Sequence, residues 1–136
     1  MTMSKRILFL IVLALSLAVL SFAMKPPHYR SDEFNKAAVE AYDAIFVFKL
    51  HLTDFQANHR EIEADNALTH LSNLSRNGIE SNVSYILSNY FQAIKRFQRE
   101  MPLIEQYSKD DQKKIVTKLA DQNLEVYEIV HCFHCS

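Results

Sequence analysis

The sequence predicts an all-α protein, an antiparallel up-down four-helix bundle that follows a cleaved signal peptide. Three observations support this fold class. The chain of 136 residues has one glycine and three prolines, which leaves few residues for the tight turns of a β-protein. Its apolar residues repeat at intervals of three and four, the period of an amphipathic helix. Four such segments with short connections between them are typical of a helical bundle.

The N-terminus has the features of a secretory signal. Lys5 and Arg6 provide positive charge, an apolar run follows from residue 7 to 20, and small residues precede an expected cleavage site after Ala23. An uncleaved membrane anchor is the alternative, but the run is shorter than the roughly 20 residues that a span needs. Both alternatives carry the rest of the chain out of the cytoplasm, so the predicted location is periplasmic or secreted.

Residues 1–23 are therefore assigned to the signal peptide and residues 24–136 to a single helical domain. This mature domain has 113 residues and a net charge of −3. A mildly acidic, mixed surface argues against nucleic acid as a partner and against a basic membrane-binding face. A domain of this size can bury one core without disulfide staples, and two cysteines three residues apart are no disulfide framework.

The predicted helices cover about residues 32–57, 60–76, 82–101 and 109–133. In the first helix the apolar stripe runs from Phe34 to Phe55, and Ser31 or Asp32 can cap its start. The other stripes contain Ile62, Leu68, Leu71 and Leu74, then Val83, Leu87, Tyr90, Ile94, Phe97 and Met101, and finally Ile115, Leu119, Val126, Ile129 and Phe133.

Four residues mark the remaining helix ends. Ser81 is the expected N-cap of the third helix, and Ser108 begins a capping box before the fourth. Gly78 is expected to stop the second helix, and Pro102 to end the third.

The stretch from Ile45 to Leu52 allows two structural interpretations. Its apolar residues also alternate like those of a strand, but the helical spacing around it favours helix. A cap at Thr53 would end that helix earlier. The stretch is apolar on more than one face. The first interpretation is a helix buried on two sides, and the second is a hydrophobic partner or dimer surface.

Both cysteines and two of the six histidines lie in the last nine residues. On a helix, Glu128, His131, Cys132 and Cys135 are spaced by three and four and share one exposed face. Thiolate and imidazole together suit zinc or copper. These four residues are the candidate metal ligands, at a site that is open or shared between molecules.

A Cys-x-x-Cys motif near the end of a secreted four-helix chain is similar in layout to the cytochromes c-prime. The resemblance covers the mature chain as architecture but only Cys132 and Cys135 as motif, and it implies a haem cofactor. Covalent attachment requires a histidine directly after the second cysteine. Ser136 occupies that position. Zinc or copper is therefore favoured over haem as the cofactor.

For Cys132 and Cys135, a disulfide is the favoured prediction and a metal site is the alternative. Cβ atoms three residues apart on a helix lie ~5–6 Å from each other, whereas a bridge needs ~3.5–4.5 Å. A frayed last turn would close that gap, and otherwise exposed thiols could link two chains. A redox-enzyme role is disfavoured because the dipole at a helix C-terminus opposes a thiolate.

Asn73 and Asn82 begin two glycosylation sequons, which matter in a eukaryotic source. The single glycine excludes a Gly-rich phosphate loop. The sequence thus predicts a non-enzymatic, secreted or periplasmic binding protein that contacts a protein partner or associates with itself, a dimer included. The alternative is a metal- or haem-binding four-helix protein that uses the C-terminal His/Cys cluster.

Overall fold

The computed structural model describes residues 30–132, and this part of the chain folds into four helices without a strand. The helices are α2 (Asp32–Leu50), α3 (Ala57–Leu74), α4 (Gly78–Ile104) and α5 (Lys109–His131). The prediction of an all-α, four-helix fold is confirmed. The predicted signal peptide and its cleavage site lie outside the described residues.

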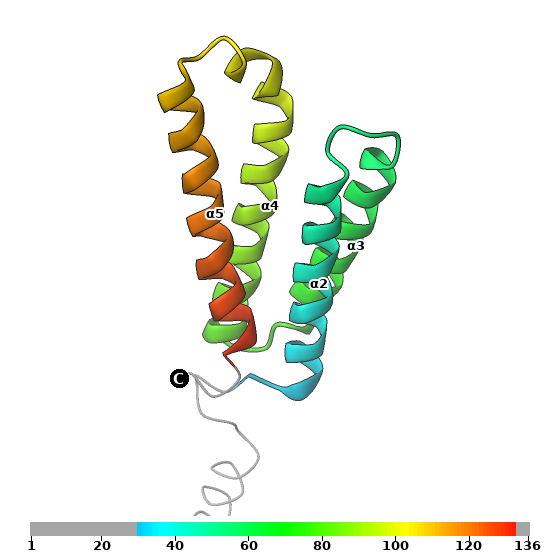
Figure 1. Ribbon diagram of the computed structural model, residues 1–136. Helices are drawn as coiled ribbons and strands as arrows, with labels where there is room; N and C mark the ends of the chain where they lie inside the picture. The colour runs from blue at the N-terminus through cyan, green and yellow to red at the C-terminus, as the bar shows by residue number, and fades with distance from the viewer. Residues whose placement is uncertain (1–29, 133–136) are drawn as a thin grey trace, which may run out of the picture.

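The helices form two hairpins that meet at one end. α2 lies beside α3, and α4 lies beside α5 (Figure 1). α2 also contacts α4 and α5, and α3 contacts α4, whereas α3 and α5 do not touch. The hairpins converge where α2 and α4 begin, an end that we call the base. They diverge toward the opposite end, where the α4–α5 hairpin extends beyond its neighbour (Figure 1).

The hydrophobic core fills the part of the molecule where the hairpins converge. α2 supplies the largest share, and Phe48 meets Phe91 of α4 edge to face with ring centroids 5.5 Å apart. α5 contributes only two buried residues, Val126 and Val130, both near its end. The stretch of α5 from residue 109 to 125 therefore lies beyond the core, although it carries apolar residues.

Two of the expected helix caps are present, and a third is displaced. The hydroxyl of Ser31 accepts a hydrogen bond from the backbone N–H of Phe34 at 3.1 Å, and Ser108 caps α5 in the same way. The prediction of Ser81 as the N-cap of α4 is wrong. Asn77 takes that role one turn earlier, because asparagine is an equally good cap and its side-chain oxygen accepts from the N–H of residue 80 at 2.9 Å.

Gly78 and Pro102 do not end helices as predicted. Gly78 is the first residue of α4, with no positive φ, so it starts a helix rather than stopping one. Pro102 lies inside the last turn of α4, which continues to Ile104. There the missing N–H removes a single hydrogen bond, and the helix closes with the N–H of Glu105 donating to the Met101 carbonyl at 3.3 Å.

α2 ends at Leu50, so the predicted end near residue 57 is wrong and the break comes earlier, as the alternative had it, although Gln56 and not Thr53 is the N-cap of α3. Asp54 offers the backbone a competing partner, since its carboxylate accepts from the N–H of Gln56 at 2.8 Å and contacts Nδ1 of His51 at 2.7 Å. Phe55 consequently lies in the connection and is 93% exposed. The expectations that Phe55 and Ile62 join the core are both wrong.

At the base, Arg30 holds the end of α5. Its guanidinium donates to the carbonyls of Ile129 at 2.7 Å, Val130 at 2.9 Å and Cys132 at 3.3 Å. These carbonyls belong to the last turn, where no intrahelical N–H reaches them and where the helix dipole favours a cation. Arg30 is 6% exposed, so this contact is shielded from water.

Glu80 connects the same region to the starts of α2 and α4. Its carboxylate accepts from the backbone N–H of Ser31 and from that of Arg76, each at 2.9 Å. Glu80 is 1% exposed. Burial lowers the pKa of Arg30, and the charge of Glu80 raises it. We call the contacts of Arg30 and Glu80 the base clamp, because together they join three helix ends.

Replacing Glu80 with glutamine is expected to destabilise the fold. The variant Glu80→Gln has one acceptor oxygen for two partly buried N–H donors, which costs about 1–3 kcal/mol of unfolding free energy. Urea denaturation should show a lower midpoint with an unchanged slope. The control Glu40→Gln changes an exposed carboxylate of α2 and should stay within about 0.5 kcal/mol. Equal effects of the two variants would contradict the clamp.

Candidate interaction surface

A small polar cluster joins α5 to α2 and α4. The side-chain oxygen of Asn123 in α5 accepts hydrogen bonds from the hydroxyls of Tyr42 in α2 at 2.9 Å and Tyr90 in α4 at 2.7 Å. Burial raises the pKa of both tyrosines, and for Tyr42 the bond to Asn123 acts in the opposite direction. One amide therefore joins three helices.

Aromatic rings continue from this cluster across the surface between α2 and α5. The ring of Tyr42 stacks on Phe46 at 6.4 Å and meets Tyr127 edge to face at 5.7 Å. His131 stacks on Tyr127 at 4.1 Å, and its Nδ1 lies 2.9 Å from the Tyr127 carbonyl. The rings form a continuous path from one hairpin to the other.

Apolar side chains extend this path into solvent on both helices. On α2, Phe46 is 40% and Leu50 65% exposed. On α5, Val116 is 56%, Leu124 57% and Tyr127 47% exposed, and Ala120 between them is also exposed. We call this set the apolar band; it consists of Phe46, Leu50, Val116, Ala120, Leu124 and Tyr127.

The apolar band distinguishes the two interpretations of the stretch from Ile45 to Leu52. Ile45 and Phe48 are fully buried, but Phe46 and Leu50 are not, so α2 is not buried on two sides between residues 45 and 52. The surplus apolar face of α2 is therefore exposed, as the partner or dimer surface that was the second interpretation would require. The α5 half of the band could have been found from the spacing of Val116, Ala120, Leu124 and Tyr127, which follows a helical period.

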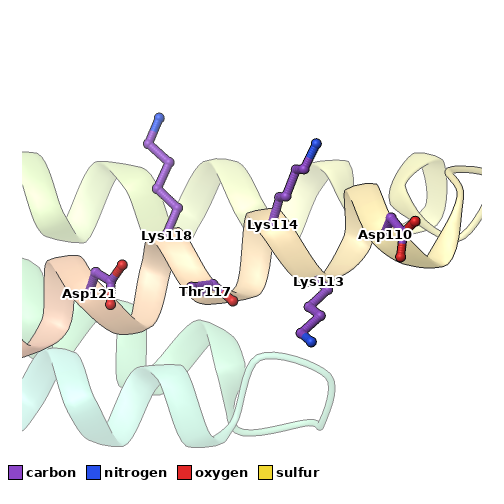
Figure 2. A pocket seen from close by; sticks show the side chains of 6 residues that line it. All are labelled: Asp110, Lys113, Lys114, Thr117, Lys118 and Asp121. Atoms are coloured by element: carbon purple, nitrogen blue, oxygen red, sulfur yellow. The ribbon is translucent and has the colours of Figure 1, made fainter.

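A charged strip borders the band on α5. A shallow hollow of about 520 Å³ is lined by Asp110, Lys113, Lys114, Thr117, Lys118 and Asp121. Figure 2 shows Lys114 and Lys118 pointing to one side of α5 and Lys113 to the other, with Thr117 between them. These lysines are exposed, so the strip is an open rim and not an enclosed ligand cavity.

The structure places three of the four predicted metal ligands, because Cys135 lies outside the described residues. Glu128 and Cys132 line a hollow of about 480 Å³ beside the start of α4, whereas the ring of His131 lies against Tyr42 of α2 at 5.8 Å. Among residues 30–132, no group of three or more His, Cys, Asp or Glu side chains is placed to hold a metal ion. The zinc or copper site stays a prediction.

Both sequon asparagines have exposed side chains. Asn73 lies in the last turn of α3 and Asn82 in the first turns of α4. Asn82 also borders the hollow that Glu128 and Cys132 line. A glycan on either asparagine would project from the base end of the molecule, away from the apolar band.

Comparison of the chain with protein-family models, curated proteins and solved structures found no match. Over residues 30–132, no helix has the length and apolarity that crossing a bilayer requires.

Removing the Asn123 amide is expected to loosen the junction between the hairpins. Asn123→Ala leaves two partly buried tyrosine hydroxyls without their acceptor, a loss of about 1–3 kcal/mol in unfolding free energy. Asn66→Ala, at an exposed position of α3, is the matched control and should change little. Urea unfolding of both variants provides the comparison, and a loss at Asn123 no greater than that at Asn66 would contradict the role of the amide.

Proposed function

We propose that this chain is a non-enzymatic binding protein that acts outside the cytoplasm and contacts a protein partner through the apolar band. The observation that carries the proposal is the exposure of large apolar side chains on two neighbouring helices, joined by the contact of Tyr42 with Tyr127. Continuous apolar surface of this kind is typical of protein interaction sites. Aromatic residues such as Phe46 and Tyr127 are frequent energetic centres of such sites.

The arrangement of the band suits a helical or extended partner segment. Its two halves lie on helices that diverge from the base, and charged side chains of α5 border it. An apolar centre with a charged rim is the general anatomy of protein interfaces. The rigid attachment of both helices at the base keeps the two halves in a fixed relation, which lowers the entropy lost on binding.

The proposal includes the maturation of the chain. Residues 1–23 act as a cleaved signal peptide, and 24–136 form one domain, an antiparallel up-down bundle. In the oxidising compartment that this route implies, Cys132 and Cys135 pair within the chain. In support, no free thiol occurs among the described residues. In a eukaryotic source, Asn73 and Asn82 are the positions for N-linked glycans.

Site-specific photo-crosslinking in the native compartment tests the binding function. A photoreactive benzoylphenylalanine replaces Phe46 or Leu124 in the full chain, and Tyr85 of α4, which is 65% exposed and outside the band, serves as the control position. We expect one product of defined mass from both band positions and not from the control.

The product should depend on the band itself. Leu50→Ala combined with Val116→Ala, which leaves the crosslinker in place, should reduce its yield about tenfold or more if these contacts drive binding. Equal labelling from the band and control positions, or a product that survives the two alanines, would overturn the proposed function.

A further inference from the structure

α5 ends directly before the first cysteine of the C-terminal Cys-x-x-Cys motif. His131 is the last helical residue, and Cys132 is the C-cap, with φ −89° and ψ 78° outside the helical region. On a helix that continued, the Cβ atoms of Cys132 and Cys135 would lie ~5–6 Å apart, farther than the ~3.5–4.5 Å of a disulfide. Cys132 has therefore left the helix, as a bridge to Cys135 requires.

Arg30 uses the carbonyl groups at this helix end. One nitrogen of its guanidinium, Nη1, donates to the carbonyl of Ile129 at 2.7 Å and to that of Cys132 at 3.3 Å. The other nitrogen, Nη2, donates to the carbonyl of Val130 at 2.9 Å. On a continued helix, the carbonyls of Ile129 and Val130 would instead accept from backbone N–H groups four residues farther along. An early helix end and the contact with Arg30 thus favour each other.

The buried position of Arg30 makes the clamp sensitive to the conformation of this helix end. The side chain is 6% exposed, so water cannot readily replace an acceptor that is lost, and a buried donor without an acceptor is costly. Arg30 also directly precedes Ser31, the N-cap of α2. A change in the backbone of Cys132 is therefore transmitted to the start of α2.

We infer that the Cys132–Cys135 bridge and the base clamp are coupled and form a redox-sensitive lock. The bridge keeps Cys132 out of the helix, with its carbonyl against Arg30. Reduction allows the helix to extend, so that backbone N–H groups compete with Arg30 for the same carbonyls. By linkage, Arg30 favours the bridged form as much as the bridge favours the contact. The inference rests on the proposed function, which includes this bridge, and adds its regulatory role.

The bridge forms by thiol–disulfide exchange with a small disulfide such as oxidised glutathione. One cysteine thiolate attacks the glutathione disulfide and releases one glutathione thiol, and the second thiolate displaces the other glutathione and closes the bridge. The two cysteines lose two electrons and two protons, and the glutathione disulfide becomes two thiols. Cys132 is half-buried and borders the hollow of about 480 Å³ beside α4, which gives a small oxidant access to it.

The lock ties the stability of the fold to the compartment. Thiols are kept reduced in the cytoplasm and become oxidised outside it. Before export, the clamp lacks the support of the bridge and the chain opens more easily. After export, oxidation completes the clamp, which holds α2 and α5, and with them the two halves of the apolar band, in a fixed relation.

The equilibrium between the chain and glutathione tests the lock. The purified mature chain is incubated with mixtures of reduced and oxidised glutathione, free thiols are trapped by alkylation, and intact mass gives the bridged fraction. The same titration in urea provides the value for the unfolded chain. We expect an equilibrium constant for bridge formation at least about tenfold larger in the folded chain than in the unfolded one.

Arg30→Lys should remove most of this preference, because an ammonium cannot donate to three carbonyls in the geometry of the guanidinium. Arg60→Lys is the matched control, since Arg60 bonds only to side chains near its own position on α3. Asn123→Ala controls for general destabilisation, since it lowers stability without touching the clamp. Both controls should keep the native equilibrium constant within about twofold.

Equal constants for the folded and unfolded native chain would overturn the inference, even if Arg30→Lys fails to fold. A folded Arg30→Lys variant with the native constant, or a shift no larger than that of Asn123→Ala, would also overturn it. A chain in which no bridge forms at any glutathione ratio would refute the pairing in the proposed function as well. A bridge that forms equally well with and without the fold would refute only the lock.

Discussion

The base clamp is the constraint on which the rest of the structure depends. Arg30 and Val130 are 100 residues apart in the chain, yet a buried hydrogen bond of 2.9 Å joins them. Glu80 binds the start of α2 to the turn before α4 through two further, partly buried bonds. Burying an arginine or a carboxylate costs free energy that hydrogen bonds such as these must offset, so these helix ends can come together in few other ways.

Fixing the helices at one end determines where they can separate. Tyr42, Tyr90 and Asn123 join α5 to α2 and α4. Farther from the base, α4 stays joined to the α2 side through Phe48 and Phe91 and through the bond from Gln98 to the Leu52 carbonyl, whereas α2 and α5 diverge (Figure 1). Side chains of α5 above this level lose α2 as a neighbour, and those of α2 lose α5. The apolar band lies at this level and beyond it. Its exposure follows from the geometry of the clamp as well as from the sequence of the two helices.

The sequence predicted the four helices because each carries a continuous apolar period, and it predicted Ser31 and Ser108 because capping is a local interaction. It missed Asn77 because two good cap residues stood within one turn of each other. The base clamp could not be predicted. Charged residues normally lie on solvent faces, and only the tertiary meeting of three helix ends makes burial of Arg30 and Glu80 favourable.

The candidate surface was predictable only in part for a related reason. α5 carries two apolar stripes, one through Val126 and Val130 and one through Val116, Ala120, Leu124 and Tyr127, and periodicity alone does not say which one faces the core. The register of α5 against α2 decides this, and Arg30 sets that register at the helix end. The contact of Arg30 with the end of α5 thus favours burial of the first stripe and exposure of the second.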